Sequence, residues 1–527
     1  MKTPAPSAPA REVELKLVLP PEALSRIRRA GALSRLPGLC PLGRARHDNL
    51  VAVYWDTVDG ALGAAGIALR TRTQAGTQTL TVKADARAAG LVADRLEVNA
   101  PLPHDSLGAP PDLAALPDPR LRRRLERLVG ENRLVPVYET RIMRTARRYR
   151  NADGACFEAA IDLGEVCAQG RTAAVSEIEL EWRAGSPVAM LDAAAGLARA
   201  YPARISLVSK ADRARRLVTQ DGPHAVTAGP PVDICGRAAN AACAAVLSDC
   251  VAQIAANQPA ILEAASPDGI HQMRVGIRRF RAAMKSFPAA MATPAAAGVL
   301  PGLRRVFAIL GAARDLDVFT ADTLPALAAT APDGMPSMVA LAAAAAELRA
   351  EAWQDVRAAL EDSEFTVLVI DAARLAVMTG EAPAGDPDAL ADLAEARLER
   401  HWRQVSRRAR RLDRLDSEGR HDLRKRLKML RYDVEIFAPL WRPRDVRPML
   451  KPLRRIQDAF GAVNDAATAG AVAARAAKRL ATVDAAAAAG FVAGWSAAEA
   501  ERRFADARRH WEKLAATPPF WAEKARN

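Results

Sequence analysis

The sequence predicts an α+β chain in which a closed antiparallel barrel of about eight strands is followed by an all-α domain. Three observations support this prediction. Charged and apolar residues alternate with period two in stretches up to residue 182, which is typical of strands with one polar face. From residue 233 onward helical spacing dominates. In that second half, an 18-residue segment recurs 150 residues later, which indicates two structural copies.

The chain has 527 residues, which is more than one hydrophobic core usually contains, so we expect separate domains. We place the first domain at residues 1–218 and the second at residues 233–527. Residues 219–232, TQDGPHAVTAGPPV, form the expected linker because they are rich in glycine and proline.

The first domain contains eight stretches that are typical of strands. They are Glu12–Leu19, Val51–Trp55, Ile67–Thr73, Thr77–Ala84, Asp94–Leu102, Tyr138–Arg150, Cys156–Asp162 and Val175–Trp182. Helical segments are expected between them, each starting at or near a proline, a residue that suits the first turn of a helix. These prolines are Pro20, Pro119 and Pro187.

Period-two alternation places charged side chains on a shared side of these strands. Acids concentrate in the first and last strands, whereas arginines and lysines concentrate in the middle ones. The charged residues are Glu12, Glu14, Lys16, Arg70, Arg72, Lys83, Arg95, Glu97, Arg141, Glu158, Asp162, Glu177, Glu179 and Glu181. A closed barrel would pair these groups across its lumen. The alternative is a sandwich with its polar face in water, which explains single strands better than the full set.

Such a lumen favours triphosphate chemistry. Clustered carboxylates hold hard divalent cations, and these cations bridge phosphate oxygens that basic side chains bind from the opposite wall. The motifs are ExExK at Glu12–Lys16, YWDTVDGALGAAGIALRTR at Tyr54–Arg72, RxE at Arg95–Glu97, ExExE at Glu177–Glu181, and Leu207–Lys210. With these motifs, the region Arg11–Leu217 resembles the CYTH domain of the triphosphate tunnel metalloenzymes.

This resemblance implies hydrolysis of tripolyphosphate or a related triphosphate to diphosphate and phosphate, with water attacking the terminal phosphorus in line. It implies that Mg²⁺ or Mn²⁺ is bound by Glu12, Glu14 and two of Glu177, Glu179 and Glu181. The implied substrate-binding residues are Lys16, Arg70, Arg72, Lys83, Arg95, Glu97, Arg141 and Lys210. The implied catalytic residues are Glu12, Glu14, Lys16, Glu158 and Asp162, the last two orienting water or a second metal. Thiamine triphosphate, nucleoside triphosphates and cyclase chemistry remain open.

The repeated segment of the second domain reads IHQMRVGIRRFRAAMKSF at Ile270–Phe287 and RHDLRKRLKMLRYDVEIF at Arg420–Phe437. Counted from the histidine of each copy, aligned basic residues lie within about 80° of one helical face. They are Arg274, Arg278, Arg281 and Lys285, then Arg424, Lys428 and Arg431. A stripe of apolar residues runs beside them, as in a helix docked on a core. Because the aligned cations repel one another, they favour an anionic ligand over a solvated face.

These basic helices resemble the CHAD domain, the conserved histidine α-helical domain. The matching residues are His271, Arg274, Arg278, Arg281, Arg314, Asp315 and Asp317, then His421, Arg424, Lys428, Arg431 and Tyr432. The resemblance implies two four-helix repeats that bind inorganic polyphosphate, with Lys285 and Lys425 among the binding residues. Other expected helices are Arg237–Gln253, Met338–Leu360 and Ala466–Ala516. Together, the two domains resemble bacterial CYTH-CHAD inorganic triphosphatases.

The net charge of +14 favours an anionic partner without saying which, and from the resemblance we expect tripolyphosphate and long-chain polyphosphate. A polyphosphate scaffold without turnover is the alternative, although acids in its lumen would repel phosphate. Nucleic acid is disfavoured because few aromatic residues interrupt the basic stripes. The N-terminus lacks the apolar core of a signal peptide, and the apolar runs look too short to cross a bilayer. We therefore expect a cytoplasmic protein with no membrane partner, associated with polyphosphate granules where these form.

Overall fold

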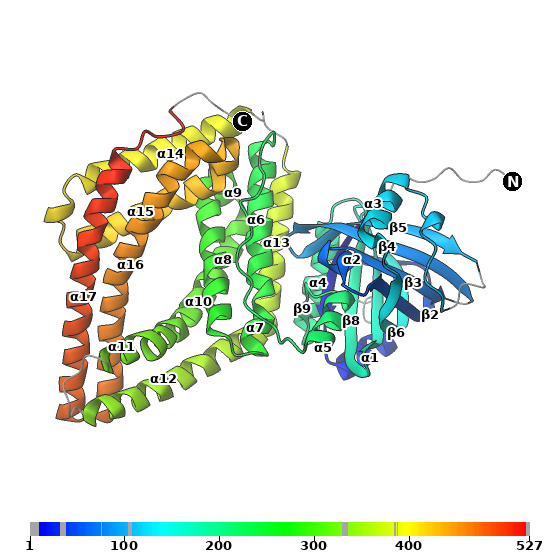
Figure 1. Cartoon of the computed structure of the whole chain (residues 1–527), viewed down its shortest axis with the longest axis horizontal. Helices are drawn as coiled ribbons and strands as arrows, with labels where there is room; N and C mark the ends of the chain where they lie inside the picture. Colours follow the sequence, from blue (N-terminus) through cyan, green and yellow to red (C-terminus); the bar gives the residue numbers. More distant parts are fainter. Residues whose placement is uncertain are drawn as a thin grey trace. The chain divides into compact units, whose positions relative to one another are not determined.

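The computed structural model describes residues 10–31, 38–74, 76–103, 108–328, 336–383, 386 and 388–522. The chain forms two compact units. The first comprises Met1–His224 and Glu361–Val377, and the second comprises Ala225–Leu360 and Met378–Asn527. The strands lie in the first unit and long helices make up the second (Figure 1). The predicted domain limits at residues 218 and 233 stay a prediction.

The first unit is built on an antiparallel sheet that closes into a ring. Its strands are β1 (Ala10–Val18), β2 (Leu39–Thr57), β3 (Ala68–Gln74), β4 (Thr77–Ala89), β5 (Val92–Leu102), β6 (Leu134–Asn151), β7 (Cys156–Ala168) and β8 (Arg171–Ala184). Among the described residues these eight strands follow the order β5-β4-β3-β2-β6-β7-β8-β1, and β5 pairs with β1 to close the ring. A short strand, β9 (Arg204–Ile205), adds to β1. The predicted eight-stranded barrel is confirmed.

The apolar faces of the strands lie on the outside of the ring, because the lumen is polar. Helices cover this outer side. They are α1 (Pro21–Ala30), α2 (Ala61–Ala64), α3 (Pro119–Val129) and α4 (Val188–Ala200). Helix α5 (Lys210–Thr219) packs instead on inward-facing residues of the ring, where Ala214 shares a cluster with Leu50 and Ile142. Leu121 and Leu125 of α3 pack in one core cluster with Leu62 of α2 and with Trp55 and Leu69 of the sheet. Much of the hydrophobic packing of the ring therefore lies outside it, which leaves room for charged side chains inside.

The second unit is built of helices joined by loops in its described residues. Its helices, with α13 shared between the units, are α6 (Ala239–Ala256), α7 (Gln258–Leu262), α8 (Pro267–Ser286), α9 (Pro288–Met291), α10 (Pro294–Val318), α11 (Leu324–Ala328), α12 (Pro336–Glu361), α13 (Ser363–Glu381), α14 (Asp388–Ala409), α15 (Ser417–Phe437), α16 (Pro443–Leu480) and α17 (Val483–Ala515). The predicted all-α second half is confirmed.

Helices α8 and α15 carry the repeated segment, and they pack against each other. The apolar stripe of each is buried, as the spacing predicted: Met273, Ile277, Phe280, Met284 and Phe287 in α8, and Leu423, Leu427, Leu430, Val434 and Phe437 in α15. The rings of Phe287 and Phe437, which occupy the same position in the two copies, lie 5.5 Å apart. The two copies therefore meet through equivalent residues.

Two expectations about the helical half are wrong. The expected single helix Ala466–Ala516 is divided between α16 and α17, because Ala481 takes a left-handed conformation with φ 52° and Thr482 caps the next helix by accepting a hydrogen bond from Ala485 N. In addition, Ala239–Leu262 and Pro294–Leu327 are long and apolar enough to cross a bilayer. Core helices pass the same test, and half of Ala239–Leu262 is buried. The absence of a membrane partner stays a prediction.

Candidate functional site

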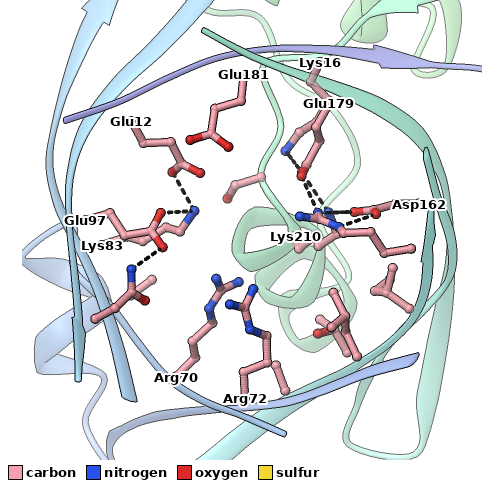
Figure 2. Close-up of a pocket in the computed structure, with 18 of the residues that line it drawn as sticks. Glu12, Lys16, Arg70, Arg72, Lys83, Glu97, Asp162, Glu179, Glu181 and Lys210 are labelled. Atoms are coloured by element: carbon pink, nitrogen blue, oxygen red, sulfur yellow. Dashed lines mark hydrogen bonds and ion pairs between the residues drawn. The ribbon is translucent and has the colours of Figure 1, made fainter. Parts of the chain in front are cut away.

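The lumen of the ring contains a cavity of about 550 Å³ (Figure 2). Nine cationic and seven anionic side chains line it among the described residues, so the cavity suits a ligand with net negative charge. The cations are Lys16, Arg46, Arg70, Arg72, Lys83, Arg95, Arg144, Arg183 and Lys210, and the acids are Glu12, Asp48, Glu97, Glu158, Asp162, Glu179 and Glu181.

Strand register brings the acids of β1 and β8 together. Glu14 lies opposite Glu181 and Lys16 lies opposite Glu179 in the antiparallel pair. Directly opposite residues share one face of a sheet, so both motifs point to the lumen side. Lys16 Nζ lies 3.2 Å from Glu179 Oε1, which offsets part of the repulsion among the carboxylates.

Lys210 enters the lumen from the N-terminus of α5. Ser209 and Asp212 form a capping box there: Asp212 N donates to Ser209 Oγ (3.0 Å) and Ser209 N donates to Asp212 Oδ2 (3.1 Å). The cap fixes the first turn of the helix and so aims Lys210. Its ammonium contacts three carboxylates, Asp162 (2.9 Å), Glu177 (2.6 Å) and Glu179 (2.9 Å).

Arg144 binds the same acidic cluster from β6. Its Nε and Nη2 donate to the two oxygens of Asp162 at 2.7 and 2.6 Å, and Nη2 also contacts Glu179. Burial would raise the pKa of Asp162, but Lys210 and Arg144 hold that pKa below its ordinary value. Asp162 is therefore ionised and occupied on both oxygens, and its role is to hold the two cations in place.

Arg70 and Arg72 differ from the other lumen cations. Within the described residues, no carboxylate lies at ion-pair distance from either guanidinium; Arg70 Nη1 donates only a long hydrogen bond to Tyr54 Oη (3.4 Å). Burial, followed by the charges of Arg70 and Arg144, lowers the pKa of Arg72. Both side chains point into the lumen on the wall away from Glu12 and Glu181 (Figure 2). They are cations that lack a counter-ion, as expected of groups that bind an anionic ligand.

Glu181 is a lumen acid with a raised pKa, although Arg183 Nη2 contacts it at 2.7 Å. Burial, and then the carboxylates of Glu12, Glu97 and Glu158, raise its pKa to about 7, and Arg183 offsets only part of this rise. Glu12 lies near Glu181 in the lumen (Figure 2) and accepts from Lys83 Nζ at 2.6 Å. Burying carboxylates together costs free energy unless a cation joins them.

A divalent cation fits this chemistry. Oxygens of Asp162, Glu177 and Glu179 lie within 4.8 Å of one another, but there the ammonium of Lys210 already supplies the positive charge. Glu12, Glu179 and Glu181 line the cavity and offer only carboxylate oxygens, the ligands that Mg²⁺ and Mn²⁺ prefer. Lysine and arginine side chains contact these acids too, Lys83 and Arg95 at Glu12, and Lys16, Arg144 and Lys210 at Glu179, so the choice of metal ligands stays a prediction.

The second unit has a basic face, which we define as His271, Arg274, Arg278, Arg314, Arg424, Lys428 and Arg431. It spans the contact between α8 and α15, where Arg278 Nε donates to Tyr432 Oη at 3.0 Å. Arg274 Nη1 donates to the carbonyl of Phe307 (2.7 Å), and Arg424 Nη1 donates to Asn464 Oδ1 (2.9 Å). These contacts fix the arginines without neutralising them.

Like charges repel across the basic face. Burial, and then the guanidiniums of Arg424, Arg278 and Arg431, lower the pKa of Lys428 to about 8. Burial also lowers the pKa of Arg274 to about 10, with Arg278 and Arg314 adding to the effect while Asp315 opposes it. Cations from both helices thus form one field of positive charge that an anionic ligand would relieve.

Comparison with known protein families assigns each of the two sites to a domain family. Residues 10–214 match the CYTH domain family, and residues 245–474 match the CHAD domain family. The chain is a CYTH domain fused to a CHAD domain. The CYTH match contains the whole ring of strands, and the CHAD match contains both basic helices. The predicted two-domain resemblance is confirmed.

Three solved structures are similar to parts of the chain. The CHAD domain from the plant Ricinus communis is 28% identical with a TM-score of 0.50, and the match covers 58% of this chain and 99% of that one. An adenylyl cyclase candidate from Hippeastrum with a dominant triphosphatase activity is 23% identical with a TM-score of 0.29, over 39% of this chain and 95% of that one. PptA from Streptomyces chartreusis is 17% identical with a TM-score of 0.38, and the match covers 53% of this chain and 99% of that one.

Most of the predicted CYTH site residues line the cavity or are buried in contact with residues that line it. Those that line it are Glu12, Lys16, Arg70, Arg72, Lys83, Arg95, Glu97, Glu158, Asp162, Glu179, Glu181 and Lys210. Glu14 and Glu177 are buried beside the lining residues, with Glu14 contacting Arg95 and Glu177 contacting Lys210. Their roles in binding and turnover stay predictions.

The placement of Arg141 in the lumen is wrong. Its guanidinium is 60% exposed on the outer face of β6, where Nε donates to Glu139 Oε1 at 2.7 Å. Thr140, Ile142 and Arg144 line the cavity, so the inward residues of this strand are the even-numbered ones. Arg144 occupies the place expected of Arg141.

Several lumen residues were not predicted, among them Arg144, Arg46, Arg183 and Tyr54. The signal for Arg144 is present in the sequence but ambiguous, because the segment RIMRTARRYR carries arginines on both faces of its strand. Only the pairing of Arg144 with Asp162 on β7 decides which face points inward. Arg46 lies in the first half of β2, which shows no clear alternation.

The predicted CHAD residues separate into two groups. His271, Arg274, Arg278, Arg281, Arg424, Lys428 and Arg431 are partly buried, whereas Lys285, His421 and Lys425 are exposed. Arg281 extends the basic face, with its guanidinium 5.6 Å from the ring centre of Phe307. Binding of polyphosphate by these residues stays a prediction.

Proposed function

We propose that the CYTH domain hydrolyses inorganic tripolyphosphate, with Mg²⁺ or Mn²⁺ as cofactor, and that the CHAD domain binds long-chain polyphosphate. One observation carries the first proposal. In the part of the chain that the structure describes, no carboxylate lies at ion-pair distance from Arg70 or Arg72, and these guanidiniums lie on a different wall of the cavity from Glu12 and from Glu181, whose pKa is raised (Figure 2). A phosphate chain with a bound divalent cation would place its oxygens against the guanidiniums of one wall and its cation against the carboxylates of the other.

The cations of the lumen would bind and orient the substrate. Arg70 and Arg72 would grip the oxygens of adjacent phosphates through their guanidinium forks, with Lys83 adding a point charge. Arg144 and Lys210 are held rigidly by Asp162, so they would face the charge that develops on the transferred phosphate without rearrangement. The first turn of α5 adds the partial positive charge of a helix N-terminus beside Lys210.

The acids of β1 and β8 would hold the cation. Glu12, Glu179 and Glu181 are the residues that fit, and a bound Mg²⁺ or Mn²⁺ would neutralise phosphate oxygens and assist a water nucleophile. Lys16 contacts Glu179 and Arg95 contacts Glu12 at 3.0 Å, so both acids have their orientation set by neighbouring cations. The water would attack the terminal phosphorus in line with the diphosphate leaving group.

Phosphate release from tripolyphosphate, thiamine triphosphate and nucleoside triphosphates, measured with Mg²⁺, Mn²⁺ and chelator, tests the proposal. We expect cation-dependent release that favours tripolyphosphate. Glu12→Gln and Arg72→Ala should each reduce it by at least about a hundredfold. Glu165→Gln is the matched acid control, because Glu165 lies 41% exposed against Arg141 on the outer face. Equal activity in Glu12→Gln and the control would sink the assignment of the lumen.

The CHAD proposal depends on the basic face, where burial and the guanidinium of Arg278 on α8 lower the pKa of Arg424 and Lys428 on α15. Arg424→Ala with Lys428→Ala removes two of them without touching the buried apolar stripe. We expect binding of long-chain polyphosphate to weaken at least about tenfold and to fall steeply with salt. Arg403→Ala is the control, since Arg403 is 78% exposed on α14. Preferential binding of duplex DNA or RNA by the native protein would contradict the proposal.

A further inference from the structure

Three arginines that the proposed reaction does not use gather at one end of the lumen. Arg46 Nη2 contacts both oxygens of Glu158 at 3.2 Å, Arg148 Nε lies 3.4 Å from Glu158 Oε2, and Arg183 Nη2 lies 3.8 Å from Glu158 Oε1. We call Arg46, Arg148 and Arg183 the arginine rim. Arg46, Arg183 and Glu158 line the cavity, so the rim belongs to its wall.

Strand register shows that the rim forms a second level of the lumen. Arg144, Asp162 and Glu177 lie side by side on β6, β7 and β8. Four residues away on each strand, Arg148, Glu158 and Glu181 repeat the same arrangement. Four residues of a strand span about 13 Å, and an even number keeps the side chains on the inner face. The rim therefore faces the same lumen at a distance that one phosphoryl group cannot bridge.

The charges of the rim are not balanced. Three guanidiniums share the carboxylate of Glu158, and within the described ranges only Arg183 has a second acidic partner, Glu181 at 2.7 Å. The rim side chains are 60%, 56% and 39% exposed for Arg46, Arg148 and Arg183, whereas the side chain of Glu158 is 10% exposed. Exposed ion pairs of this kind contribute little to stability, so folding alone does not account for three of them on one acid.

We propose that the arginine rim binds the phosphates of a linear polyphosphate that extend beyond the three held between Arg70, Arg72 and Lys210. The inference rests on the proposed triphosphatase function and extends its substrate class to short chains longer than three phosphates. Guanidinium forks match phosphate oxygens, and repeated charges suit a chain that carries one charge on each unit. A nucleobase would need a flat apolar surface, and Trp182, which also lines the cavity, offers one, so ATP is included in the test below.

The test compares kcat/KM for tripolyphosphate, tetrapolyphosphate and ATP in the full-length protein and in the double variant Arg46→Ala with Arg148→Ala. Substrate is kept in large excess, so binding by the CHAD domain removes a negligible fraction. We expect kcat/KM of the double variant to fall about tenfold for tetrapolyphosphate and to change by no more than about twofold for tripolyphosphate. Arg141→Ala is the matched control, because its guanidinium is also 60% exposed but lies on the outer face. Its kcat/KM for both phosphate chains should equal that of the native protein.

Each other outcome has a defined meaning. Equal losses on both phosphate chains, or no loss on either, would overturn the rim as a subsite. A loss on ATP without a loss on tetrapolyphosphate would assign the rim to nucleotides and also overturn the proposal. If the native protein hydrolyses no triphosphate, the proposed function fails, and the rim is then tested by calorimetric binding. A lower affinity of the variant for tetrapolyphosphate, with unchanged affinity for tripolyphosphate, would support the rim as a subsite, because the CHAD domain is identical in both proteins. Equal affinities of the native and variant proteins for tetrapolyphosphate would overturn it.

Discussion

Binding of polyphosphate by the basic face should depend on pH between 7 and 9 through Lys428. Its pKa of about 8 lies below the ordinary 10.5 because of burial and the guanidiniums of Arg424, Arg278 and Arg431. Phosphate oxygens placed against the ammonium favour its charged form, so binding raises this pKa again. At a pH where Lys428 of the free protein is deprotonated, association therefore takes up a proton. The affinity for polyphosphate consequently falls as pH rises above about 8.

The expected size of this effect follows from the pKa. With a pKa of about 8, Lys428 is about nine-tenths protonated at pH 7 and about one-tenth protonated at pH 9. If the pKa returns to about 10.5 in the complex, the association constant falls about tenfold over this interval, which is about 1.4 kcal/mol. Arg274, with a pKa of about 10, adds little below pH 9.

Fluorescence anisotropy of labelled long-chain polyphosphate at constant ionic strength measures this directly. Lys428→Arg should remove most of the pH dependence, because a guanidinium stays charged throughout the range. Lys425→Arg, at an exposed position of the same helix, should leave the native pH profile unchanged. An association constant that is flat between pH 7 and 9 in the native protein, or a slope that persists in Lys428→Arg, would refute the reasoning.

Three further predictions concern the CYTH domain. Arg144→Lys replaces a two-pronged contact by a point charge and should lower kcat/KM for tripolyphosphate by about tenfold to a hundredfold, whereas Arg141→Lys should stay within about twofold. The raised pKa of Glu181, about 7, means that its protonation favours the folded state below about pH 4.5 and that this contribution is lost as pH rises through about 7. Glu181→Gln should therefore raise the free energy of unfolding at pH 8 by about 1–3 kcal/mol in chelator, measured by urea denaturation, and a decrease would contradict the assigned burial. Gly164→Ala places a Cβ 1.9 Å from the Arg141 carbonyl oxygen and should cost more than about 3 kcal/mol, while Gly229→Ala, with no heavy atom within 4 Å, should melt as the native protein does.

The sequence by itself determined which face of most strands and helices carries charge. Period-two alternation placed Glu12, Lys16 and Glu179 on the lumen side, and all three line the cavity. Helical spacing separated the buried stripe of α8 and α15 from the basic stripe, and Met273 and Leu427 are buried as expected. These are local properties, because the period of a strand or helix fixes the directions of its own side chains.

Only the tertiary structure decided which charged groups meet. Arg144 rather than Arg141 enters the lumen because β6 pairs with β7 in the register that sets Arg144 against Asp162, and both arginines fit the local pattern equally well. Lys210 reaches three acids because the capping box of α5 aims it, and the pKa of Glu181 is raised by burial and by the carboxylate of Glu12, which the pairing of β1 with β8 brings near. Register, closure and docking are contacts between segments far apart in the chain, and no local period encodes them.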